Sequence, residues 1–200
     1  MVVGCGGTGI PVAHSLLRLG VKHIVLIDGD NVESSNLNRQ FSYSVQDIGR
    51  KKSAILSEKL MESGISANIR NIVHYLTEEN ASGYIEDIDF IFDCTDSIST
   101  KFFIAQLSRE KEKILIHSGV DRDSGQVFLQ HGSGPYLSDI VSEFKNEDKS
   151  VNTVNSAMMT GTVMISEFLA YIRGGWTPRM ITIDIYPELR VKTCNFSGGG

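Results

Sequence analysis

The chain has 200 residues, a formal net charge of −5 and a hydrophobic fraction of 41%. This length suffices for one domain with a substantial core, and the acidic balance argues against a general nucleic-acid or anionic-membrane surface. The apolar runs are too short to cross a bilayer and no signal peptide precedes the first glycines, so we expect a cytoplasmic protein without a membrane partner. Three isolated cysteines, with no Cys-x-x-Cys pair, predict neither a zinc site nor disulfides.

The N-terminal half alternates strand-like and helical segments, which is typical of βαβ units. Val2-Val3 runs directly into glycines at 4, 6, 7 and 9, so either a very short strand suffices or a preceding segment is missing. A helix should follow to about Leu19, with Gly20 ending it. Residues 23–27 form a β-rich run that stops at Asp28.

Further elements follow in the same order. Asp47 is expected to cap a helix whose inward side carries Ile48, Ile55, Leu56 and Leu60, with Gly64 as its end. Residues 67–73 and 88–92 are predicted strands, the second ending in acid at Asp93. Residues 98–107 are predicted to be helical, and 114–117 to form another strand.

The C-terminal half has a different pattern. Residues 126–129 are a predicted strand, and a polar loop is expected over about 131–152. Apolar and small residues then alternate in steps of four and three, which predicts one helix face; these residues are Val154, Met158, Gly161, Ile165, Phe168 and Ile172. Residues 180–185 and 189–193 resemble an antiparallel hairpin around Pro187.

These elements predict an α/β fold: a three-layer, Rossmann-like domain with a mostly parallel mixed sheet. Antiparallel strands should lie at its C-terminal end. We expect residues 1–197 to form this single domain and residues 198–200, three glycines, to form a flexible tail.

The first chemical signal is Gly4-x-Gly6-x-x-Gly9 between a strand and a helix. Glycines let backbone amides approach phosphate oxygens, and the helix N-terminus supplies positive potential. Asp28, nineteen residues beyond Gly9, ends the next strand, where a carboxylate can accept both hydroxyls of a ribose. These features fit NAD as well as ATP.

Basic residues that follow Asp28 and Asp30 favour a nucleoside triphosphate as the ligand. Arg39 and Lys52 follow Asp28 and Asp30, and an arginine fork with a lysine point charge can neutralise phosphate oxygens. Asp96, after the fourth strand, is well placed to hold Mg²⁺ on those phosphates. A dinucleotide-dependent oxidoreductase would leave Arg39, Lys52 and Asp96 without a role.

In order, these motifs resemble the ThiF/MoeB/HesA family of adenylating enzymes, to which ubiquitin-activating enzymes are related. The resemblance rests on Gly-x-Gly-Gly-x-Gly, Asp-x-Asp, Asn-Leu-x-Arg-Gln, a lysine thirteen residues after the arginine, and Asp-Cys-Thr-Asp. It implies catalytic roles for Arg39, Lys52 and Asp96, with Asp96 as the Mg²⁺ ligand. It also implies a nucleotide site made of Gly4, Gly6, Gly7, Gly9, Asp28, Asp30, Asn36, Arg39, Gln40 and Lys52.

The resemblance implies ATP-dependent adenylation of the C-terminal carboxylate of a small carrier protein or peptide, for example one ending in Gly-Gly, with pyrophosphate release. Family members dimerise, so we expect a homodimer. The expected loop at 131–152 contains no cysteine, which disfavours a covalent thioester or persulfide step. Two alternatives remain: a catalytically weak nucleotide-binding or interaction module, and an NAD-dependent oxidoreductase.

Overall fold

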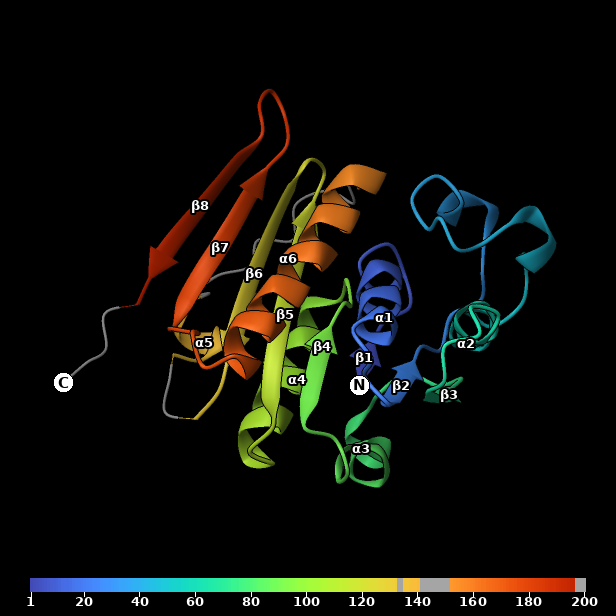
Figure 1. Cartoon of the computed structure of the whole chain (residues 1–200), viewed down its shortest axis with the longest axis horizontal. Coiled ribbons are helices and arrows are strands. Elements are labelled where there is room, and N and C mark those ends of the chain that lie inside the picture. The colour runs from blue at the N-terminus through green and yellow to red at the C-terminus, as the bar shows by residue number, and fades with distance from the viewer. Residues whose placement is uncertain (133–134, 141–151, 197–200) are drawn as a thin grey trace.

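The computed structural model describes residues 1–132, 135–140 and 152–196. Its strands form one sheet in the order β3-β2-β1-β4-β5-β6-β7-β8 (Figure 1). The predicted tail at 198–200 lies outside the described residues, as does most of the predicted loop at 131–152. The sheet and its helices confirm the predicted three-layer α/β fold.

The first five strands are parallel and are joined by βαβ-type connections. Their order from one edge is β3, β2, β1, β4 and β5. The bounds of these strands are β1 Val2–Val3, β2 His23–Ile27, β3 Asn68–Ile72, β4 Phe90–Asp93 and β5 Ile114–Asp121.

The remaining strands continue the sheet in antiparallel fashion, as the sequence predicted. β7 and β8 form the expected hairpin, and β8 is the outer strand of this end of the sheet (Figure 1). The bounds are β6 Ser124–Gln130, β7 Arg179–Asp184 and β8 Arg190–Asn195.

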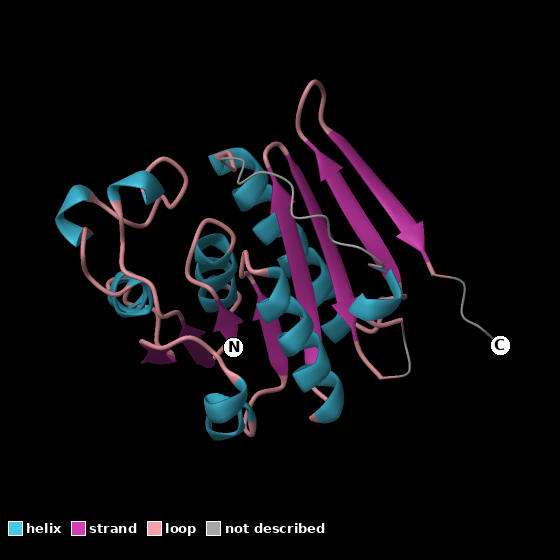
Figure 2. Cartoon of the chain, turned by 180° about the vertical axis from the view of Figure 1, so that it is seen from behind, coloured by secondary structure: helices cyan, strands magenta, loops and turns pink. Residues whose placement is uncertain are grey.

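Helices cover both faces of the sheet, and each face has its own apolar core (Figures 1 and 2). One core includes side chains of α1, α2 and α6 packed against residues such as Leu26 and Phe92. The other includes side chains of α3, α4 and α5 packed against Ile91 and Leu115. The helices span α1 Gly9–Arg18, α2 Lys52–Met61, α3 Glu78–Ile85, α4 Ile98–Glu110, α5 Leu137–Ile140 and α6 Val154–Ile172.

The start of α2 differs from the prediction. Asp47 does not cap this helix: its carboxylate accepts from the backbone and hydroxyl of Ser44 and closes a short 3₁₀ turn. Gly49, at φ +87°, redirects the chain, and residues 49 and 50 hydrogen-bond with Val32 instead. α2 therefore begins only at Lys52, and Ile48 is exposed rather than inward.

The inward face of α6 also differs from the predicted stripe. Gly161, Ile165 and Phe168 are buried as expected, but Met158 and Ile172 are exposed. The face that packs is rotated toward Ala157, Thr160 and Met164, which are buried, because α6 must fit α1 as well as the sheet. At the contact, a Cβ on Gly161 would lie 2.7 Å from Pro11 Cγ.

In the ranges that the structure describes, no helix combines the length and apolar character needed to cross a membrane.

Candidate active site

The predicted site residues gather at the carboxyl ends of the central parallel strands. β1 lies between β2 and β4 in the sheet. After β1 the chain forms β2 and β3 on one side of it, and then crosses to form β4 on its other side. The crevice outside such a reversal of strand order is where open α/β sheets bind their ligands. The glycine loop follows β1, Asp28 follows β2, and the segment with Asp96 follows β4.

Two of the loop glycines are required by the packing of the loop itself. Gly4 has φ +91°, and a Cβ there would lie 2.7 Å from the carbonyl oxygen of Cys94. A Cβ on Gly9 would lie 1.9 Å from the carbonyl oxygen of Gly4. These contacts bring the start of α1 directly beside the end of β4, so the loop can only be built with glycine at both positions.

The other two glycines lie beside the basic segment. A Cβ on Gly7 would lie 2.9 Å from the Cβ of Ala157 and 3.8 Å from Arg39 Cγ, and one on Gly6 would lie 3.4 Å from Gln40 Nε2. Gln40 is buried, and its Oε1 has no hydrogen-bond partner in the described part of the chain. The structure thus brings Arg39 and Gln40 to the loop, as the resemblance implied.

Asp28 is buried and held by backbone amides on both sides. Its Oδ2 accepts from the N–H of Cys5 at 2.7 Å, and its Oδ1 accepts from the N–H of Asp30 at 2.8 Å. Burial raises the pKa of Asp28, while these two amides and the Lys52 ammonium oppose the shift. Each carboxylate oxygen keeps further lone-pair capacity, which is what a ribose diol requires.

Lys52 and Asp30 form the charged pair beside Asp28. Lys52 Nζ lies 2.9 Å from Asp30 Oδ2, and the lysine side chain is almost fully buried whereas Asp30 is half-exposed. The other oxygen of Asp30 accepts a short hydrogen bond from the hydroxyl of Tyr75. Together these contacts hold the Lys52 ammonium at the rim of the site, close to Asp28.

Asn36 is buried, but its side chain acts within its own turn. Its Oδ1 accepts from the N–H of Glu33 at 3.1 Å and so closes a short 3₁₀ turn over residues 34–36. The half-buried Arg39 donates from Nη1 to the carbonyl of Ser35 and to Asn38 Oδ1, both at 3.0 Å. This arrangement fixes the segment that carries Arg39 against the glycine loop, and a direct phosphate contact by either side chain stays a prediction.

Asp96 lies at the exposed rim after β4, and its carboxylate has no hydrogen-bond or ion-pair partner among the described residues. The hydrogen bond and charge of Asp30 raise the pKa of the Tyr75 phenol to about 12, and burial, Asp28 and Asp96 add smaller contributions. Asp28 and Asp96 follow β2 and β4, the two strands that flank β1, so both lie at the carboxyl edge of the sheet. In the described ranges, no three His, Cys, Asp or Glu side chains form a metal site by themselves.

Sequence reasoning missed the contacts that four residues make at the site. Tyr75 packs on Gly29, where a Cβ would lie 2.8 Å from its ring, and Tyr43 donates to the carbonyl of Cys5 at 2.6 Å. Lys101 and His117 contact Asp93 beneath the rim. His117 ending a predicted strand was the only local signal, since the partners of the others lie far away in the sequence.

The cysteines near the site are poorly suited to nucleophilic catalysis. Burial raises the pKa of the thiols of both Cys5 and Cys94, and nearby aspartates add to the shift. Both side chains therefore remain thiols at neutral pH, whereas the thiolate is the reactive form. This agrees with the predicted absence of a covalent step, which remains a prediction.

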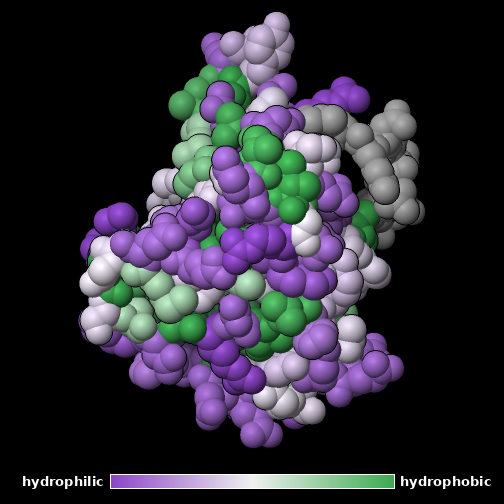
Figure 3. Space-filling model, turned by 90° about the vertical axis from the view of Figure 1, so that its right-hand side faces the viewer, coloured by the Kyte–Doolittle hydropathy of each residue, from purple (hydrophilic) through white to green (hydrophobic). Residues whose placement is uncertain are grey.

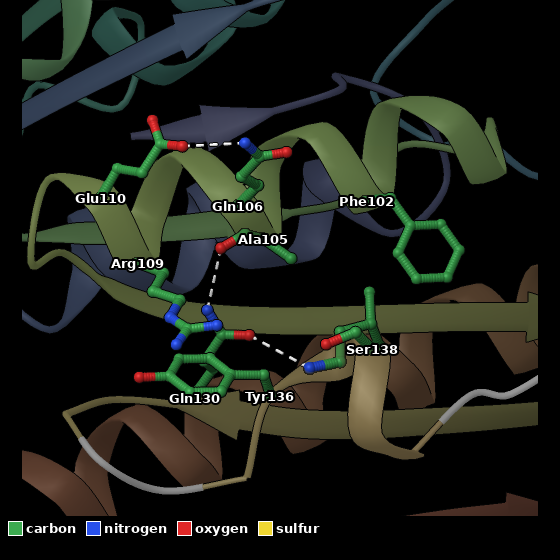
Figure 4. Close-up of a pocket in the computed structure, with 9 residues that line it drawn as sticks. Phe102, Ala105, Gln106, Arg109, Glu110, Gln130, Tyr136 and Ser138 are labelled. Atoms are coloured by element: carbon green, nitrogen blue, oxygen red, sulfur yellow. Dashed lines mark hydrogen bonds between the residues drawn. The ribbon is translucent and has the colours of Figure 1, made fainter.

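A cavity of about 580 Å³ lies at the other end of the strands, between α4, β6 and α5 (Figure 4). Gln130, which lines it, pairs with Leu115 near the start of β5, far from the carboxyl ends of the parallel strands. The guanidinium of Arg109 stacks over the ring of Tyr136 at 4.1 Å. This cavity is distinct from the candidate site and contains none of its residues.

A mixed α/β sheet with a glycine loop and strand-end acids at its switch point defines a Rossmann-like domain, a class in which ligands bind in the crevice at that point. The model of the ThiF family matches residues 1–196, and the chain belongs to this family.

Two curated relatives are longer proteins, and the chain matches only part of each. It is 31% identical over 162 residues to a probable molybdopterin-synthase adenylyltransferase from Porphyra purpurea, which covers 80% of this chain and 42% of the relative. It is 30% identical over 131 residues to the sulfur carrier protein adenylyltransferase of Thermus thermophilus, covering 66% of this chain and 48% of that protein. The chain thus spans less than half the length of either relative.

Solved structures confirm the fold. E. coli MccB crystallised with ATP superimposes with a TM-score of 0.83 at 19% identity, covering 99% of this chain and 63% of MccB. A structure of PaaA gives a TM-score of 0.78 at 21% identity, with 97% and 62% covered. At these identities the likeness concerns the arrangement of strands and helices.

Proposed function

We propose that this chain is the adenylation domain of an ATP-dependent adenylyltransferase. Its acceptor is the C-terminal carboxylate of a small carrier protein or peptide. Membership of the ThiF family and the names of the curated relatives support this reaction class. The observation that carries the proposal is the grouping, next to a glycine loop, of a buried strand-end acid, Asp28, with the buried Lys52 ammonium, which is paired to Asp30.

The reaction requires positioning and charge neutralisation more than a protein nucleophile. An oxygen of the acceptor carboxylate attacks the α-phosphorus of ATP and forms a new P–O bond. The bond between the α-phosphorus and the oxygen that bridges it to the β-phosphorus breaks, and pyrophosphate leaves with that oxygen. The products are an acyl-adenylate and pyrophosphate, so the protein need only align the reactants and stabilise the charge on the phosphates.

The residues divide this work by charge. Asp28 accepts hydrogen bonds from the ribose hydroxyls, and the amides of Gly6, Gly7 and Gly9 face the phosphates. The ammonium of Lys52 partly leaves Asp30, or bridges Asp30 and a phosphate oxygen. Together with Arg39, it neutralises the phosphate oxygens. The side chain of Gln40 lies beside Gly6, and its buried Oε1, which has no partner among the described residues, supplies an acceptor for a nucleotide group.

Asp96 fits a role as the Mg²⁺ ligand, because Mg²⁺ in such sites is held by one or two carboxylates together with substrate phosphates and water. Its carboxylate is exposed and has no protein partner in the described part of the chain, so it is free to bind the ion. The ion would supply charge neutralisation at the phosphates. Asp30, already paired with Lys52 and Tyr75, supports this group of side chains.

The name of the Thermus relative supports a sulfur-carrier-like protein as the partner that donates the carboxylate, and we propose a chain ending in Gly-Gly as its simplest form. We also propose a two-fold homodimer, the commonest closed assembly. Apolar side chains are exposed next to the site at Phe41, Val45 and Met158. The segment 31–51 lies on the right in Figure 1 and so faces the viewer in Figure 3, where hydrophobic areas alternate with hydrophilic ones.

The proposed use of ATP fits a cytoplasmic enzyme.

Nucleotide titration by calorimetry tests the proposal. ATP with Mg²⁺ should bind well above NAD, and pyrophosphate should exchange into ATP when a peptide ending in Gly-Gly is present. Lys52→Met should weaken ATP binding by about 10- to 100-fold, since it removes a charge-assisted contact worth about 1.5–3 kcal/mol. Lys59→Met, on the exposed side of the same helix, serves as the control.

Three results would count against the proposal in different ways. Equal or tighter binding of NAD would favour an oxidoreductase. ATP binding without exchange would favour a nucleotide-binding module. Unchanged ATP affinity in Lys52→Met would place the phosphates elsewhere.

A further inference from the structure

Beneath the rim that carries Asp96, three ionisable side chains are buried together. Asp93 ends β4, Lys101 lies in the first turn of α4, and His117 lies opposite Asp93 on β5. Asp93 Oδ2 is 2.8 Å from His117 Nδ1 and 3.4 Å from Lys101 Nζ, and all three residues are at most 5% exposed. The proposed reaction gives none of them a direct role.

The charges in this cluster are balanced. Burial opposes ionisation of Asp93, but the Lys101 ammonium and the hydrogen bond from His117 hold the pKa of the carboxyl well below its usual range. Burial, followed by the Lys101 charge, lowers the pKa of His117. These shifts favour a carboxylate at Asp93 and a neutral imidazole at His117, whose Nδ1 faces that carboxylate and donates to it in the matching tautomer.

A buried ion pair is weak evidence for stability, because desolvation offsets most of the attraction between the charges. Such a pair does, however, fix the elements that contribute to it. Lys101 Nζ also donates to the carbonyl of Ser118 at 2.6 Å, and Ser118 Oγ donates to the carbonyl of Asp93 at 2.8 Å. These contacts lock the end of β4 to β5 and to the first turn of α4.

The other oxygen of Asp93 shapes the turn above it. Asp93 Oδ1 accepts from the backbone N–H of Thr95 at 3.0 Å and from Thr95 Oγ1 at 2.7 Å. The glycine loop passes close to this turn, because a Cβ on Gly4 would lie 3.3 Å from the same backbone nitrogen. Asp96 follows Thr95 directly, and its own carboxylate contacts no described protein group. The backbone of this turn alone therefore sets where Asp96 points.

We propose that Asp93, charged and braced by Lys101 and His117, is a positioning residue that holds the Asp96 carboxylate in place through the Thr95 turn. The inference rests on the proposed function, in which Asp96 binds Mg²⁺. In this proposal Asp93 has a structural task, which is to position Asp96. Asp93 itself touches neither nucleotide nor metal.

Two variants separate positioning from simple stability. Asp93→Asn alone leaves the Lys101 charge buried without a partner and risks unfolding. The double variant Asp93→Asn/Lys101→Met removes both charges with side chains of similar size, so the fold is retained while the acceptor for Thr95 is weakened. Thr95→Val removes only the hydroxyl contact and leaves the ion pair intact. Lys113→Met, just beyond the C-terminal end of α4, is the matched control.

The readout is pyrophosphate exchange as a function of Mg²⁺ concentration, with ATP affinity measured separately. In the double variant we expect the half-saturating Mg²⁺ concentration to rise about tenfold and kcat to fall about 100-fold, as a displacement of about 1 Å can cause. Thr95→Val should show the same changes at about tenfold, the size of one hydrogen bond to a charged group. The affinity for ATP without Mg²⁺ should stay within about twofold of wild type, because the base, ribose and phosphate contacts are untouched.

The proposal is overturned if folded double-variant protein, or Thr95→Val, exchanges pyrophosphate at the wild-type rate with wild-type Mg²⁺ dependence. Failure of the proposed function gives a different result, because wild-type protein would then bind ATP·Mg²⁺ without exchanging pyrophosphate. In that case the Mg²⁺ dependence of ATP binding, compared between the same variants and wild type, still tests whether Asp93 positions Asp96. Wild-type protein that binds no ATP would overturn both inferences.

Discussion

At the scale of single residues, the two acids of the β4–α4 turn have opposite surroundings. Asp93 is fully buried and uses both carboxylate oxygens within the protein, whereas Asp96 is exposed and uses neither in the described structure. A side chain without protein contacts contributes little to folding, and its charge remains available to a ligand. The sequence predicted the role of Asp96 from the resemblance, but the buried task of Asp93 became visible only in the structure.

Replacing Asp96 with Ala should therefore separate activity from stability. The melting temperature should remain within a few degrees of wild type, since exposed substitutions usually change stability by less than about 0.5 kcal/mol. Pyrophosphate exchange should fall by about 10²- to 10³-fold, as when a charge-positioning group is lost. Asp87→Ala, an exposed acid at the other end of β4, should leave exchange unchanged. Exchange retained in Asp96→Ala would remove this residue from the proposed mechanism.

His117 predicts a pH dependence of stability. Its pKa is lowered in the folded protein, so the folded state favours the neutral imidazole. The corresponding stability is fully present above the unfolded pKa of about 6.5, and it is lost as the pH falls from there through the folded pKa. Urea unfolding at pH 7 and pH 5 should show a smaller loss for His117→Gln than for wild type.

The exposed His23 at the start of β2 provides the control for this measurement. His23→Gln should lose as much stability as wild type between pH 7 and pH 5. An equal loss in His117→Gln and wild type would mean that this histidine is protonated in the folded protein, contrary to the direction given by its burial.

At the scale of elements, the glycine loop shows how close packing builds the site. The first residue of α1 approaches the strand-end loop so tightly that a Cβ on Gly9 would overlap the carbonyl of Gly4. The contact between α6 and α1 at Gly161 is similarly close. These approaches bring the helix N-terminus, the basic segment and α6 to one edge of the sheet.

Two helical glycines make a matched test of this packing. Gly9→Ala should destabilise the protein by about 1–3 kcal/mol or more, because the loop must move to admit the methyl group. A Cβ on Gly83, inside α3, would meet no atom within 4 Å, so Gly83→Ala should stabilise the protein by about 0.5–1 kcal/mol. Denaturant titration measures both, and a Gly9→Ala variant as stable as wild type would contradict the close approach.

At the scale of the whole molecule, the proposed dimer follows from apolar side chains exposed beside the site. Sedimentation equilibrium at micromolar concentration should give about twice the 22.0 kDa of one chain. Met158→Glu should shift this equilibrium toward monomer, since it places a charge on a surface that the dimer would bury. Leu189→Glu, exposed between β7 and β8, should not. A single 22.0 kDa species in the wild-type protein would refute the dimer for this chain.

The sequence by itself determined the order of the strands, the helices α1, α2, α4 and α6, the glycine loop and the acids at the ends of β2 and β4, but no pattern predicted α3 at Glu78–Ile85. These features depend on short patterns: apolar periodicity, glycine where the backbone must come close, and polar residues where a strand stops. Local patterns also placed the β7–β8 hairpin. They failed at the start of α2, where Asp47 closes a turn with Ser44, and on α6, where packing against α1 rotates the inward face.

Only the tertiary structure decided which charged groups meet. Lys52 pairs with Asp30 across 22 residues, Tyr75 reaches Asp30 across 45, and Asp93 meets Lys101 and His117 from three separate elements. The sheet order that places β1 between β2 and β4 also lies beyond any local pattern. The reason is physical: these contacts depend on how elements distant in sequence pack together, and the burial that sets their charge states exists only after that packing is complete.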